Sequence, residues 1–130
     1  MAKKKDLINF PYAKAPLPGT IKEVSKGIYW VRMRLPMLID HVNVYILEGT
    51  NDLTIIDTGL NVSNCRVAWS EIFKNYFSSK PVRKVVITHH HPDHIGLLGW
   101  FCDNFDVEVF TSRSSWLLAR MLYFDKQNQP

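Results

Sequence analysis

Four of the five histidines in this sequence, together with one aspartate, stand within six positions of one another: His89, His90, His91, Asp93 and His94. Neutral imidazole and carboxylate are ligands that zinc and similar metals accept. When a His-x-His pair lies on a loop leaving a strand, both rings can point to one side, and the following Asp-His pair can face a neighbouring position. Such spacing could hold two adjacent metal ions, which would polarise a bound water into a hydroxide nucleophile near neutral pH.

The elements predicted around this cluster place it where enzyme sites are common. Residues 84–88 (KVVIT) are predicted as a buried strand that runs directly into the histidines, and a helix is predicted to follow. Sites in α/β proteins are usually built at the carboxyl ends of strands. Gly96 and Gly99 are expected to permit close approach of the backbone. The alternative is an incidental His-rich turn or structural cap, with Asp93 only capping the helix that follows it.

The rest of the chain alternates between strand and helix patterns. A turn at residues 49–52 joins two strand patterns closely enough to predict an antiparallel hairpin. Besides 84–88, strands are predicted over residues 28–34, 42–48, 53–57 and 106–110. Residues 1–20 are rich in proline and lysine and are predicted to form an extended N-terminal arm.

Two longer helices are predicted, and they differ in how much cover they need. The first starts at Ser63 or Asn64, either of which is a good N-cap, and its Trp69 and Phe73 are interpreted as core residues and not as a ligand-stacking stripe. The second spans residues 114–125 behind a serine cap, and apolar side chains surround almost its whole circumference. This second helix therefore needs cover on more than one side.

Composition sets broad limits on the class of protein. The chain has 130 residues, 46% hydrophobic and 22% charged, which is typical of a globular fold. Its net charge of +4 owes much to three lysines near the N-terminus, so nucleic acid is not an expected partner. Cys65 and Cys102 show no metal-binding spacing and are interpreted as free buried thiols. No signal peptide or membrane-spanning run is apparent, so a cytoplasmic location is expected.

Two segments resemble motifs of a known family. Residues 88–96 (THHHPDHIG) look like the signature of the metallo-β-lactamase superfamily, and residues 54–59 (TIIDTG) resemble its first motif, a strand that ends in Asp and Gly. Residues 35–47 (LPMLIDHVNVYIL) also resemble the early strands of a subgroup of its hydrolase-like members. The resemblance covers roughly residues 20–125 and implies an α/β fold. The expected fold is half of the family's αββα sandwich, with a mixed, largely antiparallel sheet and helices on one face.

The resemblance also implies roles for individual residues. His89 and His91 would bind a first metal ion, and Asp93 and His94 a second, with Asp93 also orienting the attacking water. Asp57 would not bind metal but would hold the metal loop by hydrogen bonds. His90 occupies the variable place between ligands and is given no role. His41 precedes a strand and is more typical of a surface or hydrogen-bonded histidine than of a ligand.

The sequence departs from the family pattern after His94, because no histidine follows it. The family completes its site with a later histidine, a bridging aspartate and a final histidine, so residues 21–130 are expected to be the N-terminal half of such a domain. Fewer ligands predict weak metal binding by the isolated chain. An uncovered sheet face and last helix predict association, with a second copy or with a complementary half.

Three functions follow as hypotheses. The first is a zinc-dependent hydrolase acting on an ester, thioester, lactam or phosphodiester, although iron or manganese would also accept these ligands. The second is a non-catalytic half domain that keeps the motif by inheritance, and the missing ligands favour it for the isolated chain. The third is a nucleic-acid-processing member of the superfamily, for which the surface is too weakly basic. The sequence does not identify a substrate.

Overall fold

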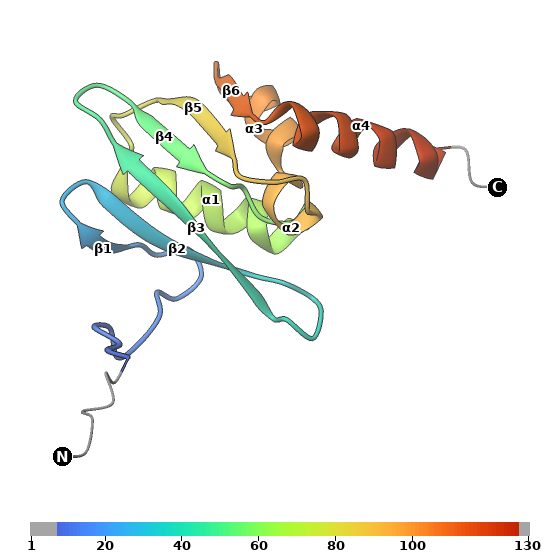
Figure 1. The fold of residues 1–130 in the computed structure, drawn as a ribbon. Coiled ribbons are helices and arrows are strands. Elements are labelled where there is room, and N and C mark those ends of the chain that lie inside the picture. Colours follow the sequence, from blue (N-terminus) through green and yellow to red (C-terminus); the bar gives the residue numbers. More distant parts are fainter. Residues whose placement is uncertain (1–7, 128–130) are drawn as a thin grey trace, which may run out of the picture.

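The computed structural model describes residues 8–127, which form one six-stranded sheet with helices packed against it (Figure 1). The strands lie in chain order, and the first four are antiparallel neighbours while β4, β5 and β6 are parallel. They are β1 (Lys22–Ser25), β2 (Ile28–Arg34), β3 (His41–Glu48), β4 (Leu53–Ile56), β5 (Val82–Ile87) and β6 (Glu108–Thr111). The mixed, largely antiparallel sheet and the β3–β4 hairpin are confirmed, whereas β1 was not predicted.

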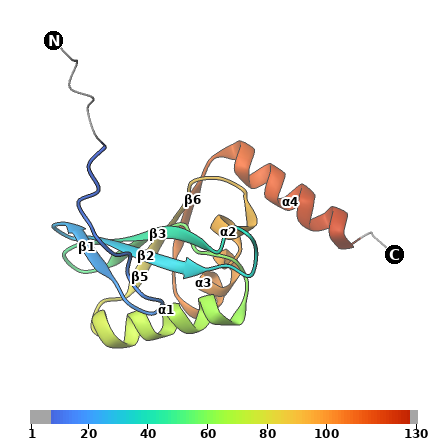
Figure 2. The same cartoon turned by 90° about the horizontal axis from the view of Figure 1, so that it is seen from below.

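The helices are α1 (Ser63–Tyr76), α2 (Pro92–Ile95), α3 (Leu98–Asn104) and α4 (Arg113–Gln127). Figure 2 shows α1 and α3 together on one side of the sheet, as expected for half of the sandwich. The same view shows α4 extending away from the body of the molecule. No helix within residues 8–127 is both long and apolar enough to cross a membrane.

The core lies between the sheet and α1 and α3. Because strand side chains alternate between faces, β2 buries Val31 and Met33 and leaves Arg32 between them partly exposed on the other face. Trp69 of α1 is fully buried, stacks on Phe73 and meets Phe101 of α3 edge-on with ring centroids 5.2 Å apart. The interpretation of Trp69 and Phe73 as core residues is therefore confirmed.

Both predicted helix caps were placed wrongly. The residue before α1 is Val62, and neither Ser63 nor Asn64 caps the helix, because the helix already includes both of them. At α4 the cap is Ser112, whose hydroxyl accepts a hydrogen bond from the backbone N–H of Ser115 at 3.1 Å. In a run containing three serines the sequence does not say which one keeps an extended backbone, and that residue becomes the cap.

Two smaller predictions were also wrong. A Cβ added to Gly99 would meet no atom within 4 Å, so this glycine does not permit a close approach. Cys65 is a free buried thiol as predicted, but Cys102 is exposed because it lies on the outer side of α3. The segment before β1 contains no helix or strand from residue 8 to 21, and Tyr12 in it packs on Trp30 of β2 with ring centroids 6.2 Å apart.

Candidate metal centre

The histidine loop leaves the sheet beside Asp57. Asp57 follows β4 and the loop follows β5, and these two strands are parallel neighbours, so both ends meet at one edge of the sheet. The backbone N–H of Thr88 donates to Asp57 Oδ1 at 2.8 Å, and the Thr88 hydroxyl donates to Asp57 Oδ2 at 2.6 Å. Asp57 is buried and has a φ of 62°, in the left-handed region that aspartate tolerates better than most side chains. Its carboxylate therefore fixes the start of the loop.

Asp57 and the residue after it also hold the far end of the loop. His94 Nδ1 lies 2.8 Å from Asp57 Oδ2, so the two carboxylate oxygens serve three donors in all. The backbone N–H and the hydroxyl of Thr58 both donate to the His94 carbonyl at 2.8 Å, and the Thr58 hydroxyl accepts from Leu97 N–H at 3.0 Å. Thr58 and Thr88 are positioning residues to which the sequence reasoning gave no role, although both stand inside the quoted motifs.

The hydrogen bonds of Asp57 assign the tautomers of two histidines. A hydroxyl carries one hydrogen, and Thr88 gives it to Asp57, so Thr88 Oγ1 accepts from His89 Nδ1–H at 2.9 Å. His94 likewise donates from Nδ1 to Asp57. In both rings Nε2 is then left with its lone pair free, which is the state that a metal ion requires.

The candidate ligand atoms of the loop form two neighbouring pairs. His89 Nε2 lies 3.1 Å from His91 Nδ1, close to the spacing of about 3.3 Å that two nitrogens bound tetrahedrally to one zinc ion would have. Asp93 Oδ2 lies 3.5 Å from His94 Nε2. The rings of His89 and His94 connect the pairs, with centroids 4.0 Å apart. This geometry fits one cation at each pair.

A second grouping of three residues includes Asp57 in place of His91 and Asp93. One ligand atom each from Asp57, His89 and His94 lie within 4.8 Å of one another. We assign Asp57 to positioning nonetheless, because its two oxygens already accept three hydrogen bonds from the loop. The ligand roles of His89, His91, Asp93 and His94 stay a prediction that this geometry fits.

Burial also favours the metal-binding form of His89. Partial burial lowers the pKa of His89, and the neighbouring His94 and His91 add to this effect. A lowered pKa keeps the ring neutral near neutral pH, and a metal ion binds the neutral ring. The local environment therefore holds this side chain ready for a cation.

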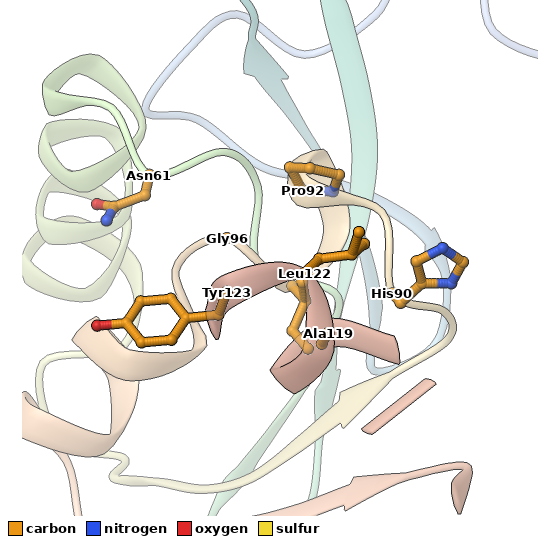
Figure 3. A pocket seen from close by; sticks show the side chains of 8 residues that line it. Asn61, His90, Pro92, Gly96, Ala119, Leu122 and Tyr123 are labelled. Atoms are coloured by element: carbon orange, nitrogen blue, oxygen red, sulfur yellow. The ribbon is translucent and has the colours of Figure 1, made fainter. Parts of the chain in front are cut away.

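The other two histidines supply no atom to these pairs, although the ring of His90 meets that of His91 edge-on with centroids 5.0 Å apart. His90 lines a different cavity of about 330 Å³ between the loop and α4, where Asn61, Ala119, Leu122 and Tyr123 also lie (Figure 3). His41 lies at the start of β3 with Nδ1 2.6 Å from Asp40 Oδ1, which makes it a hydrogen-bonded histidine as expected.

Gly96 explains how the loop can pack so closely. A Cβ at this position would lie 2.3 Å from the Pro92 carbonyl oxygen and 2.8 Å from both the backbone nitrogen of Asn61 and the carbonyl oxygen of Gly59. These are backbone atoms and cannot move aside cheaply. The prediction of a close backbone approach at Gly96 is confirmed.

Comparisons with known proteins agree with this geometry. A family model of the metallo-beta-lactamase superfamily matches residues 38–130. The chain is 30% identical over 106 residues to the probable metallo-hydrolase YqjP of Bacillus subtilis, covering 81% of this chain and 33% of that protein. It is 34% identical over 87 residues to a linear primary-alkylsulfatase of a Pseudomonas species, covering 67% of this chain and 12% of that protein. The chain therefore spans about a third or less of the length of these two relatives.

Solved structures show the same fold. A beta-lactamase domain protein from Burkholderia ambifaria superimposes with a TM-score of 0.80 at 33% identity, covering 86% of this chain and 36% of that one. A metallo-beta-lactamase from Pseudomonas aeruginosa, solved in its mono-zinc form, gives a TM-score of 0.65 at 19% identity, covering 83% of this chain and 48% of that one, which supports the fold alone. The motifs around Asp57 and His89, the sheet that brings them together and these matches show that the chain belongs to the metallo-beta-lactamase superfamily.

Proposed function

We propose that this chain provides the first ligands of a metal-dependent hydrolase that uses zinc. His89 and His91 would hold one ion, and Asp93 and His94 a second. The observation that carries the proposal is the pairing of candidate ligand atoms, with His89 Nε2 3.1 Å from His91 Nδ1 and Asp93 Oδ2 3.5 Å from His94 Nε2. The bound metal would supply a water of lowered pKa as the nucleophile.

The chain's own residues would prepare this chemistry. Asp57 holds His94 directly and His89 through Thr88, so in the neutral rings the hydrogen lies on Nδ1, Nε2 can bind a metal ion, and the directions of the rings are fixed. The Asp93 carboxylate lies beside His94 and is partly exposed, which suits a group that accepts a hydrogen bond from the attacking water and thereby orients it. Neither role requires the protein to move during the reaction.

The substrate is proposed only as a class. Cleavage of an ester, thioester, lactam or phosphodiester fits a metal-activated water, and relatives named as alkylsulfatases add sulfate esters to that class. The alternative is a half domain without catalytic activity. Because the chain spans 33% of the metallo-hydrolase it resembles, further ligands from elsewhere are part of the proposal, as are a second copy or complementary half as partner and a cytoplasmic location.

Zinc binding and turnover test the two hypotheses separately. The purified chain is titrated with zinc in a calorimeter, and its metal content is measured by mass spectrometry after desalting. We expect binding that is lost when His89→Ala and His91→Ala are combined and retained in His41→Ala, since His41 lies outside the pairs. Absence of zinc binding would disprove the proposed metal centre. Zinc binding that the double substitution leaves unchanged would disprove it as well.

Activity is then measured with chromogenic ester, lactam, phosphodiester and sulfate ester substrates. Hydrolysis that needs zinc and disappears in Asp93→Asn would support the hydrolase and exclude the non-catalytic alternative. Zinc binding without any hydrolysis of this panel would favour that alternative for the isolated chain.

A further inference from the structure

A second hollow lies at the same edge of the sheet as the histidine loop. Strands β2, β4 and β5 run in the same direction, so the end of β2 lies on the edge where β4 and β5 end. Figure 1 shows the β2–β3 hairpin extending beyond the end of β4. Around its far end is a cavity of about 300 Å³, lined by Arg32, Arg34, Leu35, Asp40 and His41. The proposed metal centre uses none of these residues.

Strand geometry places the two arginines together. Arg32 and Arg34 are two positions apart on β2, so they share the face opposite to the buried Val31 and Met33. The partner strand places Asn43 opposite Arg32 and His41 opposite Arg34. The register of the hairpin therefore gathers four nitrogen-bearing side chains on one face.

The arginines keep hydrogen-bonding capacity for a ligand. Arg32 uses only its Nε, which donates to Asn43 Oδ1 at 3.1 Å, and this bond fixes the plane of the guanidinium. Arg34 makes no side-chain hydrogen bond or ion pair with any residue between 8 and 127. Guanidinium groups with free N–H donors match the geometry of carboxylate and sulfate oxygens, and the Arg32 group is already held in one plane.

The charge of the hollow is positive. Asp40 is its only carboxylate within the described residues, and its Oδ1 lies 2.6 Å from His41 Nδ1. The hydrogen bond with His41 is the largest cause that lowers the pKa of Asp40, so this carboxylate stays charged and engaged with His41. The two guanidinium charges exceed the single carboxylate charge, so the hollow favours a further negative group.

An exposed apolar segment borders the hollow. Met37, Leu38 and Ile39 follow one another in the β2–β3 loop, and all three are exposed, Leu38 fully. The loop is closed by a hydrogen bond from the backbone N–H of Leu35 to the carbonyl oxygen of Asp40 at 2.8 Å. The surface here is therefore apolar at the loop and positively charged at the two arginines.

We propose that this hollow binds a single-chain amphiphile with an anionic head group. The carboxylate or sulfate head would accept hydrogen bonds from Arg32 and Arg34, and the apolar chain would lie along Met37, Leu38 and Ile39. Charge complementarity selects the head group, and the exposed apolar loop selects the tail. Binding at this site does not depend on the metal centre or on hydrolytic activity.

The test uses the metal-free chain in a chelating buffer, so that a failed metal proposal cannot affect it. Octanoate, below the concentration at which it forms micelles, is added while amide shifts are followed by NMR. Acetate tests the head group alone, and octanol tests the tail alone. We expect octanoate to shift amides of residues 32–41 and to bind at least about tenfold more tightly than either control compound, a difference of about 1.4 kcal/mol.

Matched variants identify the residues responsible. Arg34→Gln should weaken octanoate binding about tenfold and Leu38→Ser about threefold, and both residues are exposed, so folding should survive. The controls are Lys74→Gln and Val67→Ser, which remove the same kinds of group from the exposed side of α1 and should leave binding unchanged. Equal losses in controls and variants, shifts confined to α4, or binding only to anionic lipid vesicles would each overturn the proposal.

Discussion

At the scale of single residues, the carboxylate of Asp57 holds both ends of the histidine loop. Its two oxygens accept hydrogen bonds from Thr88 N–H, Thr88 Oγ1 and His94 Nδ1, and it reaches them from a left-handed backbone conformation. Removing a carboxylate from water is costly, and the three hydrogen-bond donors offset that cost. One side chain therefore sets both the path of the loop and the tautomers of two rings.

Replacing Asp57 by asparagine should separate positioning from backbone effects. Asparagine also tolerates the left-handed region, so Asp57→Asn keeps the backbone while an amide NH2 replaces one accepting oxygen. We expect zinc affinity to fall by about 10-fold to 100-fold, the usual cost of losing a group that orients metal ligands. Calorimetric titration measures it, and Asp103→Asn on the exposed side of α3 is the control. Unchanged zinc affinity in Asp57→Asn would contradict this role.

Gly96 and Gly99 make a second matched pair. Gly96→Ala would force a Cβ within 2.3 Å of the Pro92 carbonyl oxygen, so we expect a loss of about 2 kcal/mol or more in the free energy of unfolding. Gly99 has open space around it and lies in α3, where alanine is the better helix former, so Gly99→Ala should be neutral or stabilising by up to about 1 kcal/mol. Urea denaturation followed by circular dichroism compares them, and equal effects would show that the contacts at Gly96 are not rigid.

At the scale of elements, an ion pair and its hydrogen bonds connect neighbouring segments at the end of the sheet farthest from the histidine loop. Lys80, in the segment between α1 and β5, donates to Glu48 Oε1 at 2.7 Å and to the Gly49 carbonyl oxygen. The Tyr29 hydroxyl donates to Glu48 Oε2 at 2.6 Å. The hydrogen bonds from Lys80 and then from Tyr29 lower the pKa of Glu48, and the bond to Glu48 raises the pKa of Tyr29 to about 12.

This network predicts a pH dependence with two limits. Because the pKa of Glu48 is lower in the folded chain than its ordinary value of 4.5, its contribution to stability is present above that value and is lost as pH falls below it. Because the pKa of Tyr29 is raised from 10.0, its contribution is present below pH 10.0 and is lost as pH rises toward 12. Urea midpoints across pH should therefore fall less steeply in acid for Glu48→Gln and less steeply in alkali for Tyr29→Phe. Parallel profiles for variants and wild type would refute this account.

The elements also show how far sequence patterns reach. The alternation in 28–34 and the helical spacing from Cys65 to Tyr76 each have one consistent solution, because one face must be buried, and both predictions hold. β1 was missed because its four residues, Lys22–Ser25, are partly exposed and are defined by pairing with β2. The cap of α4 was missed because several serines could serve, and that of α1 because the residue before the helix is Val62, which makes no side-chain cap. The spacing of apolar residues predicts elements that bury one face. Short edge strands and helix caps depend instead on contacts with other parts of the chain, which this spacing does not show.

The same division applies to the site. The spacing of His89, His91 and His94 was enough to predict rings gathered on one strand-end loop, and the structure brings them together there. The second bond of Thr88, to His89, could not be predicted, because it depends on the parallel pairing that sets β4 beside β5. The cationic hollow was missed too, since it needs the β2–β3 register that places His41 opposite Arg34.

At the scale of the whole molecule, α4 carries a large apolar surface that remains exposed. Figure 2 shows this helix directed away from the sheet. Its large apolar residues are between 38% and 62% exposed, although they surround most of the helix, and they are Trp116, Leu117, Leu118, Met121, Leu122, Tyr123 and Phe124. A contiguous apolar surface of this kind is uncommon on stable monomers. The prediction that this helix needs cover on more than one side agrees with these exposures.

Association of the isolated chain is the corresponding prediction. We expect its sedimentation coefficient to increase over a roughly hundredfold range of protein concentration, because burying the α4 surface against another chain removes apolar area from water. Leu117→Lys combined with Tyr123→Lys should shift this curve to higher concentration, since both residues are about 60% exposed and their replacement places charge in the contact. Val67→Lys places a charge at a 55% exposed position on α1 and should not shift the curve. If all three proteins sediment as monomers throughout, α4 needs no partner and its apolar residues are stable in water, which would contradict the prediction of association.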